Sequence, residues 1–397
     1  SVENTAVAAK RVVKEGDKSQ AAIASEIAGQ LYGLELLKPS IQNNQGNTTR
    51  FVILANRKVY QKAAGKISLC FELPHTSGSL YNMLGNFIFN HVNMIMIESR
   101  PIPGKNWEYR FFVDIEGNLL LWNKALEPFE KTRLWEQGTP GFDDRDPLQE
   151  EPYFVFVPAP DEEKCRGTIL VAHGGGFTWR TGTEGLNVAW YFHNAGFHTA
   201  ILCYRLVPYT RFDAIADMQR AIRILRAKRE EWKLGEKIAV MGFSAGGMLS
   251  GNCATHYDFG NPQSEDETER FGCRPDAAVI GFGAMTAVTF PKPFGMMQDD
   301  PMMGNGIEEK FYLSIEKNVD QDTPPMFIWQ TMSDDGRNGM CLAKALQDAE
   351  VPYELHIFTP GLHGLGMADG KNDLGMNIPH ITHWGELCTE WLEDLGF

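Results

Sequence analysis

The sequence Gly-Phe-Ser-Ala-Gly at positions 242–246 constrains the fold of this chain more than any other feature. It follows the apolar run of residues 237–241 and opens a segment compatible with a helix. The G-x-S-x-G spacing predicts a sharp strand-to-helix turn that holds the hydroxyl of Ser244 in the open. Gly242 and Gly246 let such a turn close without side-chain collisions. We therefore expect an α/β fold in which one strand ends at a serine nucleophile.

A second motif, three consecutive glycines from Gly174 to Gly176, follows the apolar, strand-like residues 168–172. Such a run can be a flexible loop, a phosphate cradle or a loop of backbone N–H donors for an oxyanion. The sequence lacks a G-x-G-x-x-G or Walker pattern to complete a phosphate site. A strand before the glycines and the serine turn after them predict an oxyanion loop. We assign the donors to the N–H groups of Gly175, Gly176 and Ala245.

In the fold that these motifs predict, an acid and then a histidine follow the serine along the chain. Residues 325–330 form an apolar run that predicts a strand, and it ends beside two adjacent acids. Asp334 is our first choice for the catalytic acid and Asp335 the second, because only one of them can face the histidine. Residues 353–358 predict another strand, which leads into a glycine-rich loop that contains His363. His363 is expected to take the proton of Ser244, although a loop histidine without a role is the alternative.

With these motifs in place, residues 133–397 resemble α/β-hydrolases of the acetyl-xylan-esterase or carbohydrate-esterase-like branch. The resemblance implies a doubly wound, mostly parallel sheet and a carboxylic ester hydrolase without a cofactor. It also implies hydrolysis of small acyl esters, acetyl esters of carbohydrates above all, through an acyl-serine intermediate. A peptidase or lactonase that uses the same triad is an alternative, because a fold does not select the acyl acceptor. Further matching residues are Leu134-Trp135-Glu136, Tyr204-Arg205-Leu206, Val351-Pro352-Tyr353 and Trp384.

Residues 1 to about 118 are similar to a different group of enzymes. The stretch Thr48-Thr49-Arg50-Phe51 resembles the active-site threonine region of prephenate dehydratases. Residues 66–73, 93–97 and 107–115 predict strands and residues 78–90 a helix, and this segment is similar to the ACT regulatory domain of the same enzymes. The resemblance implies three domains, residues 1–60, 61–130 and 131–397. It also implies a phenylalanine-sensing or dehydratase-related function as an alternative, and an oligomer, since ACT folds pair through their sheets. A docking or dimerising remnant is the other interpretation. The candidate effector-binding residues are Gly78, Ser79, Leu80, Glu98, Ser99, Arg100 and Pro101.

Composition narrows the possible partners. The net charge of −14 argues against a nucleic-acid surface. The seven cysteines include no C-x-x-C pair, which favours a reducing compartment and offers no metal framework. His380 and His383 have a spacing that could hold a metal, but no acid of metalloprotease type lies nearby, so we expect no metal. Without a long apolar span we expect a cytoplasmic protein, a small ester as substrate and no membrane partner.

Overall fold

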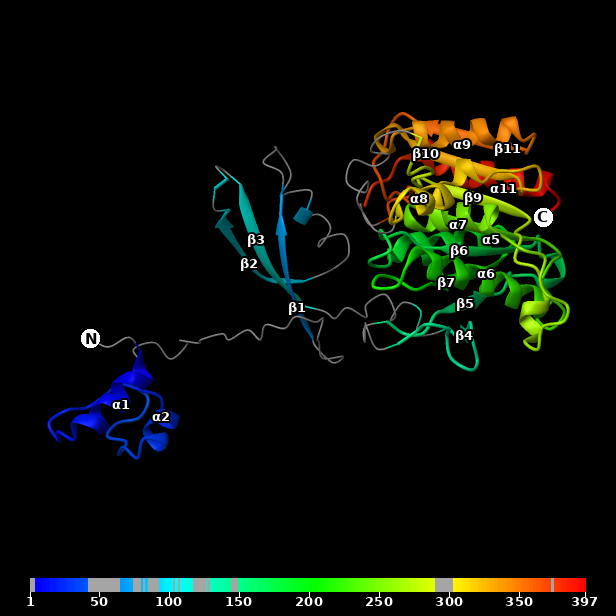
Figure 1. Ribbon diagram of the computed structural model, residues 1–397. Coiled ribbons are helices and arrows are strands. Elements are labelled where there is room, and N and C mark those ends of the chain that lie inside the picture. Colours follow the sequence, from blue (N-terminus) through cyan, green and yellow to red (C-terminus); the bar gives the residue numbers. More distant parts are fainter. Residues whose placement is uncertain are drawn as a thin grey trace. The chain divides into compact units, whose positions relative to one another are not determined.

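The computed structural model describes residues 4–41, 65–73, 80, 83–84, 93–102, 104–105, 108–116, 126, 129–143, 149–289, 303–372 and 375–397. The chain divides into two compact units, residues 1–58 and 59–397 (Figure 1). None of the described helices is both long and apolar enough to cross a membrane.

The first unit contains two short helices, α1 (Thr5–Glu15) and α2 (Glu26–Leu31). The side chain of Asn4 caps α1 by accepting a hydrogen bond of 2.9 Å from the N–H of Val7. Ser25 caps α2 in the same way. Such caps satisfy N–H groups that have no partner inside a helix. The stretch 48–51, which resembles the dehydratase active site, lies outside the described residues.

A small antiparallel sheet begins the second unit. Its strands β1 (Lys66–Glu72), β2 (Met94–Pro101) and β3 (Tyr109–Glu116) lie in the order β1-β3-β2. Val113 and Ile115 of β3 are buried among apolar side chains of β1 and β2. Burial alternates along β1, as is typical of a sheet with one covered face. The three strands lie where the sequence predicts them; most of the helical run predicted for residues 78–90 lies outside the described residues.

The α/β part is built on an eight-stranded sheet in the order β11-β10-β9-β8-β6-β7-β5-β4 (Figure 1). Strands β6 to β11 pair in parallel, whereas β5 and β4 are antiparallel to their neighbours. The predicted mostly parallel α/β-hydrolase sheet is thus confirmed. The strands are β4 (Lys131–Arg133), β5 (Tyr153–Val157), β6 (Thr168–Ala172), β7 (His198–Cys203), β8 (Ile238–Phe243), β9 (Ala277–Gly281), β10 (Met326–Thr331) and β11 (Tyr353–Phe358).

Helices cover both faces of this sheet, which explains why its central strands are apolar throughout. Alternate residues of one strand enter different cores: Leu170 of β6 packs with residues of α6, α7 and α9, and Ile169 packs with residues of α5 and α11. The helices of this part are α5 (Val188–Asn194), α6 (Arg211–Ala227), α7 (Ala245–Thr255), α8 (Ile307–Leu313), α9 (Arg337–Asp348), α10 (Pro379–Thr382) and α11 (Trp384–Asp394).

The parallel strands place four motif-bearing loops at one edge of the sheet. The glycine loop follows β6, Ser244 follows β8, the two adjacent acids follow β10 and the histidine loop follows β11. Parallel neighbours end on the same side, and ligand sites of open α/β sheets lie outside these carboxyl ends. The fold therefore gathers all the predicted catalytic segments in one region.

Candidate active site

Ser244 occupies a strained turn between β8 and α7. Its φ of 52° and ψ of −117° are unusual for a residue with a side chain. Its N–H donates a 2.9 Å hydrogen bond to the carbonyl of Gly281 at the end of β9, which anchors the turn. A Cβ on Gly242 would lie 2.0 Å from the carbonyl oxygen of Gly246, and one on Gly246 would lie 2.1 Å from that of Ala172. The motif needs glycine at both positions because backbone occupies the space.

Ser244, His363 and Asp334 form one hydrogen-bonded chain. The Nε2 of His363 lies 2.8 Å from the Oγ of Ser244, and its Nδ1 lies 2.7 Å from Oδ1 of Asp334. An ionised carboxylate only accepts hydrogen bonds, so Nδ1 carries the hydrogen and Nε2 can accept from the serine hydroxyl. The imidazole packs against the ring of Phe282 in a T-shaped arrangement, with ring centroids 5.0 Å apart. This arrangement can remove a proton from the serine as it attacks a carbonyl.

The two adjacent acids have different environments. The side chain of Asp334 is fully buried, and its Oδ2 accepts a 2.8 Å hydrogen bond from the hydroxyl of Thr331. Asp335 adopts a φ of 56°, which turns its carboxylate toward Arg337. The hydrogen bond from Arg337 lowers the pKa of Asp335. The structure therefore brings the first-choice acid to His363, whereas it pairs the second choice, Asp335, with an arginine.

The glycine loop presents two amides that donate a hydrogen bond to none of the residues described by the structure. The carbonyl of Gly174 accepts from the N–H of Thr181 at 3.3 Å, and that of Gly175 accepts from the N–H of Thr178 at 3.0 Å. In a trans peptide the N–H points opposite to the carbonyl, so the amides of Gly175 and Gly176 face away from these donors.

These amides, together with the first amide of α7, remain available to a substrate. The N–H groups of Gly175, Gly176 and Ala245 donate to no residue that the structure describes. The amide of Ala245 also opens helix α7, whose N-terminus carries partial positive charge. Such donors can stabilise an oxyanion that forms beside Ser244.

Two polar residues behind the glycine loop were not predicted as part of the site. Thr181 and the buried Glu184 hydrogen-bond to each other at 2.6 Å and both contact the amide of Gly174. Their Thr-x-x-Glu spacing matches the capping-box pattern, and the short π-helix η2 (Thr183–Asn187) begins between them. That pattern indicates the start of a helix and no role at the site, so it did not distinguish this pair.

The candidate effector residues lie on or near the small sheet. Glu98 and Arg100 form an ion pair of 2.5 Å on β2, and both side chains are exposed. Ser99 and Pro101 pair with Phe111 and Tyr109 of β3. Leu80 is also exposed. Gly78 and Ser79 lie outside the described residues, so effector binding stays a prediction.

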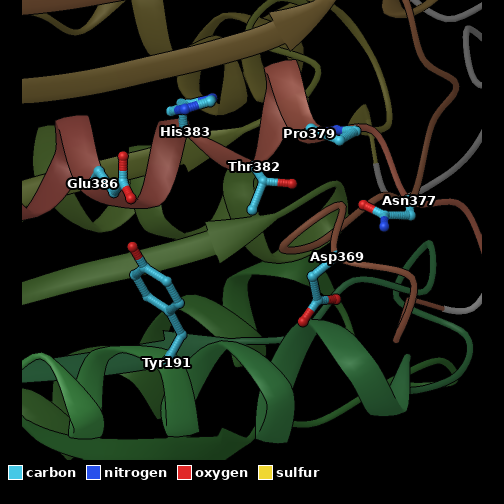
Figure 2. Close-up of a pocket in the computed structure, with 7 residues that line it drawn as sticks. All are labelled: Tyr191, Asp369, Asn377, Pro379, Thr382, His383 and Glu386. Atoms are coloured by element: carbon cyan, nitrogen blue, oxygen red, sulfur yellow. The ribbon is translucent and has the colours of Figure 1, made fainter.

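A hollow of about 410 Å³ lies between α5, α10, α11 and the chain that follows the histidine loop (Figure 2). Burial, together with the nearby charge of Glu386, raises the pKa of Tyr191 in its wall to about 12. His383 lines the hollow, whereas His380 packs against the ring of Phe358. The described residues hold no cluster of three or more possible metal ligands. The lining residues are Tyr191, Asp369, Asn377, Pro379, Thr382, His383 and Glu386.

Comparison with known proteins agrees with the site geometry. The BD-FAE family model matches residues 155–340. The crystal structure of an acetyl ester-xyloside bifunctional hydrolase from Caldicellulosiruptor lactoaceticus superposes with a TM-score of 0.61 at 33% sequence identity. The alignment covers 68% of this chain and 97% of that one. The α/β part of this chain belongs to the BD-FAE family. A Thermogutta terrifontis esterase shares the fold of the BD-FAE part, with a TM-score of 0.52 at 19% identity, over 68% of this chain and 95% of that one.

The chain also matches endo-1,4-beta-xylanase B of Butyrivibrio fibrisolvens, with 30% identity over 228 residues, or 55% of this chain and 35% of that protein. The prephenate dehydratase family model matches residues 1–59. A bifunctional chorismate mutase/prephenate dehydratase of Aquifex aeolicus is 38% identical over 117 residues, or 30% of this chain and 32% of that enzyme. The chain thus spans about a third of the length of each of these two relatives. The predicted resemblances to both groups are confirmed.

Proposed function

We propose that this chain is a serine esterase that hydrolyses small acyl esters, preferentially acetyl esters of carbohydrates, through an acyl-serine intermediate. The observation that carries the proposal is the hydrogen-bonded chain from Asp334 through His363 to Ser244. The ester-hydrolase class is that of the solved relatives of the BD-FAE part. The preference for acetylated sugars is supported by the name of the Caldicellulosiruptor enzyme, an acetyl ester-xyloside hydrolase.

In the first half of the reaction, Ser244 forms a bond to the carbonyl carbon of the ester. His363 removes the hydroxyl proton through Nε2, and Asp334 stabilises the resulting imidazolium at Nδ1. The carbonyl electrons move onto the oxygen, which the amides of Gly175, Gly176 and Ala245 bind. Each such donor contributes about 3 kcal/mol to the transition state. His363 then protonates the leaving alcohol as the carbon–oxygen bond breaks.

In the second half, water takes the place of the alcohol. His363 removes a proton from the water, which attacks the acyl carbon, and the same amides bind the second oxyanion. The bond to Ser244 breaks, its oxygen regains a proton from His363, and the carboxylic acid leaves. The chemistry needs only side chains and backbone of this chain.

Replacement of the nucleophile tests the proposal. We expect Ser244→Ala to abolish hydrolysis of p-nitrophenyl acetate. Asp334→Asn should lower kcat about 10⁴-fold, the effect known for the same change in a serine-protease triad, because it stabilises the wrong imidazole tautomer. Asp335→Asn is the matched control and should retain most of the activity, because Asp335 pairs with Arg337. Turnover by the Ser244→Ala variant would refute the mechanism.

A substrate panel tests the finer part of the proposal. Acetylated xylo-oligosaccharides, longer acyl esters, lactones and peptides should be compared by kcat/KM. We expect the acetylated sugars to be the best substrates. A larger kcat/KM for a peptide or a lactone would replace the esterase assignment with one of the alternatives.

A second candidate function concerns the N-terminal part, within the proposed division into residues 1–60, 61–130 and 131–397. The dehydratase match over residues 1–59 favours a dehydratase-related function, and the resemblance of the next segment to the ACT domain of these enzymes adds a role in sensing an aromatic amino acid. We expect titration calorimetry to detect binding of phenylalanine by the whole chain, and light scattering to detect an oligomer. An absence of heat, together with an absence of prephenate turnover, would leave the esterase as the only activity.

A further inference from the structure

A buried carboxylate lies behind the glycine loop. Glu184 is only 1% exposed. Acidic side chains are rarely buried to this extent without partners. Its Oε2 accepts a 2.9 Å hydrogen bond from the N–H of Gly174 and a 2.6 Å hydrogen bond from the hydroxyl of Thr181. Both partners belong to the loop that carries the candidate oxyanion donors.

The contacts of Glu184 close this loop at its base. The N–H of Gly174 is shared with the hydroxyl oxygen of Thr181, 3.0 Å away, and the N–H of Thr181 donates to the carbonyl of Gly174 at 3.3 Å. The loop from 174 to 181 is therefore tied at both ends to one carboxylate oxygen. The plane of the Gly174–Gly175 peptide decides where the N–H of Gly175 points. Glu184 holds the peptide before this plane through the N–H of Gly174, and it holds Thr181, whose N–H donates to the carbonyl of Gly174.

Glu184 also lies close to the backbone next to Ser244 and to the segment that follows His363. A Cβ on Gly174 would be 2.3 Å from Oε2 of Glu184 and 3.1 Å from the Cβ of Ser244, so this glycine is held between the carboxylate and the nucleophile. A Cβ on Gly366 would be 3.8 Å from the Cγ of Glu184, and Gly366 follows His363 by three residues. The carboxylate thus packs between the glycine loop and the chain that leaves the histidine.

We propose that Glu184 is a positioning residue for the oxyanion hole: it fixes Gly174 so that the next two amides face the oxyanion formed at Ser244. This inference rests on the proposed function. A carboxylate can only accept hydrogen bonds and cannot itself stabilise an anion, so Glu184 acts through the amide of Gly174. Hydrogen bonds to a charged acceptor are stronger than neutral ones, which suits a loop that must not move during the reaction.

The test compares Glu184→Ala and Glu184→Gln with wild type. Removal of one donor costs about 10²–10³-fold in kcat, so we expect the misaligned loop of Glu184→Ala to lose about 10–100-fold in kcat with little change in KM. Glu184→Gln keeps an oxygen acceptor of the same reach and should stay within about threefold of wild type. Asn187→Ala is the matched control on the same π-helix, because Asn187 bonds instead to Asp369, in the wall of the hollow in Figure 2. The control should retain wild-type kinetics.

A second readout separates this inference from the identity of the substrate. A fluorophosphonate probe reacts with an activated serine, and its phosphoryl oxygen needs the same donors as an ester carbonyl. We expect the labelling rate constant of Ser244 to fall in Glu184→Ala as kcat does, with one mole of probe still incorporated per mole of protein. Full incorporation shows that the fold is intact, which a purely structural role of Glu184 would not preserve. Should Glu184→Ala fail to fold, Thr181→Val breaks the same tie and is expected to slow labelling about 3–10-fold.

Two results would overturn the inference. One is labelling of Glu184→Ala at the wild-type rate. The other is a loss of kcat in Glu184→Gln as large as that in Glu184→Ala, which would show that the oxygen acceptor does not determine the effect. Wild-type protein that is labelled by the probe but hydrolyses no ester would refute the proposed function and leave the role of Glu184 measurable. Wild-type protein that is not labelled would refute both.

Discussion

His173, the residue that precedes the glycine loop, makes the stability of the BD-FAE part depend on pH. Its ring is fully buried and stacks on Tyr204, with centroids 4.5 Å apart. Its Nδ1 lies 2.7 Å from the carbonyl of Gly174. Burial, together with the nearby charge of Arg180, lowers the pKa of His173 from 6.5 to about 3. The imidazole therefore stays neutral in the folded protein at every pH at which the enzyme is assayed.

The sign of the effect follows from proton uptake. Below pH 6.5 the unfolded chain binds a proton at His173 and the folded chain does not, so acid favours unfolding. The stabilisation is complete above pH 6.5 and disappears as the pH falls toward 3. With pKa values of 6.5 and about 3, the loss between pH 7.5 and pH 5 is about 2 kcal/mol of unfolding free energy.

Urea unfolding followed by tryptophan fluorescence at pH 7.5 and pH 5 measures this loss. His173→Phe keeps an aromatic ring against Tyr204 but cannot be protonated. Its free energy of unfolding should therefore fall by about 2 kcal/mol less than that of wild type between pH 7.5 and pH 5. Tyr204→Phe is the control: it removes the hydrogen bond to the carbonyl of His173 and lowers stability at both pH values without changing their difference. Equal losses in wild type and His173→Phe would refute the reasoning.

Three further predictions concern the strained turn, the acid and the cysteines. Gly246→Ala should cost about 3 kcal/mol or more in urea unfolding, because backbone blocks the new Cβ, whereas Gly364→Ala, in open space at a φ of 85°, should cost about 1–2 kcal/mol. Thr331→Val removes the hydroxyl that holds Asp334 and should lower kcat about 3–10-fold at unchanged KM; an unchanged kcat would contradict this. Burial raises the pKa of Cys253 and Cys388, so both thiols should react with Ellman's reagent only after denaturation; thiol counts in native and unfolded protein check this.

The serine, the glycine loop and the histidine could be predicted because each belongs to a short motif with a local physical reason. Glycines occupy the positions at which neighbouring backbone leaves no room for a Cβ. The order of the segments along the chain follows from the fold. The choice between Asp334 and Asp335 could not be made in this way. It depends on a positive φ at Asp335 and on a hydrogen bond from Thr331 to Asp334, and neither can be predicted from the sequence.

Glu184 was missed for a different reason. An acidic residue in a polar stretch is expected at the surface, and its burial arises only when the glycine loop folds back over it. The hydrogen bond to Gly174 joins residues ten positions apart, so neither periodicity nor composition contains it. Local patterns thus predicted the candidate reacting groups, whereas the contact of Glu184 with the glycine loop follows only from the tertiary structure.

The four loops of the candidate active site follow strands that are spread from β6 (Thr168–Ala172) to β11 (Tyr353–Phe358), and the last of them follows β11. The site is complete only when that edge strand has paired with β10, because His363 follows it. During refolding, return of esterase turnover should therefore lag behind the burial of the central tryptophans. Turnover would then report the pairing of β11 with β10, and variants that slow only this step would regain activity later without being less stable.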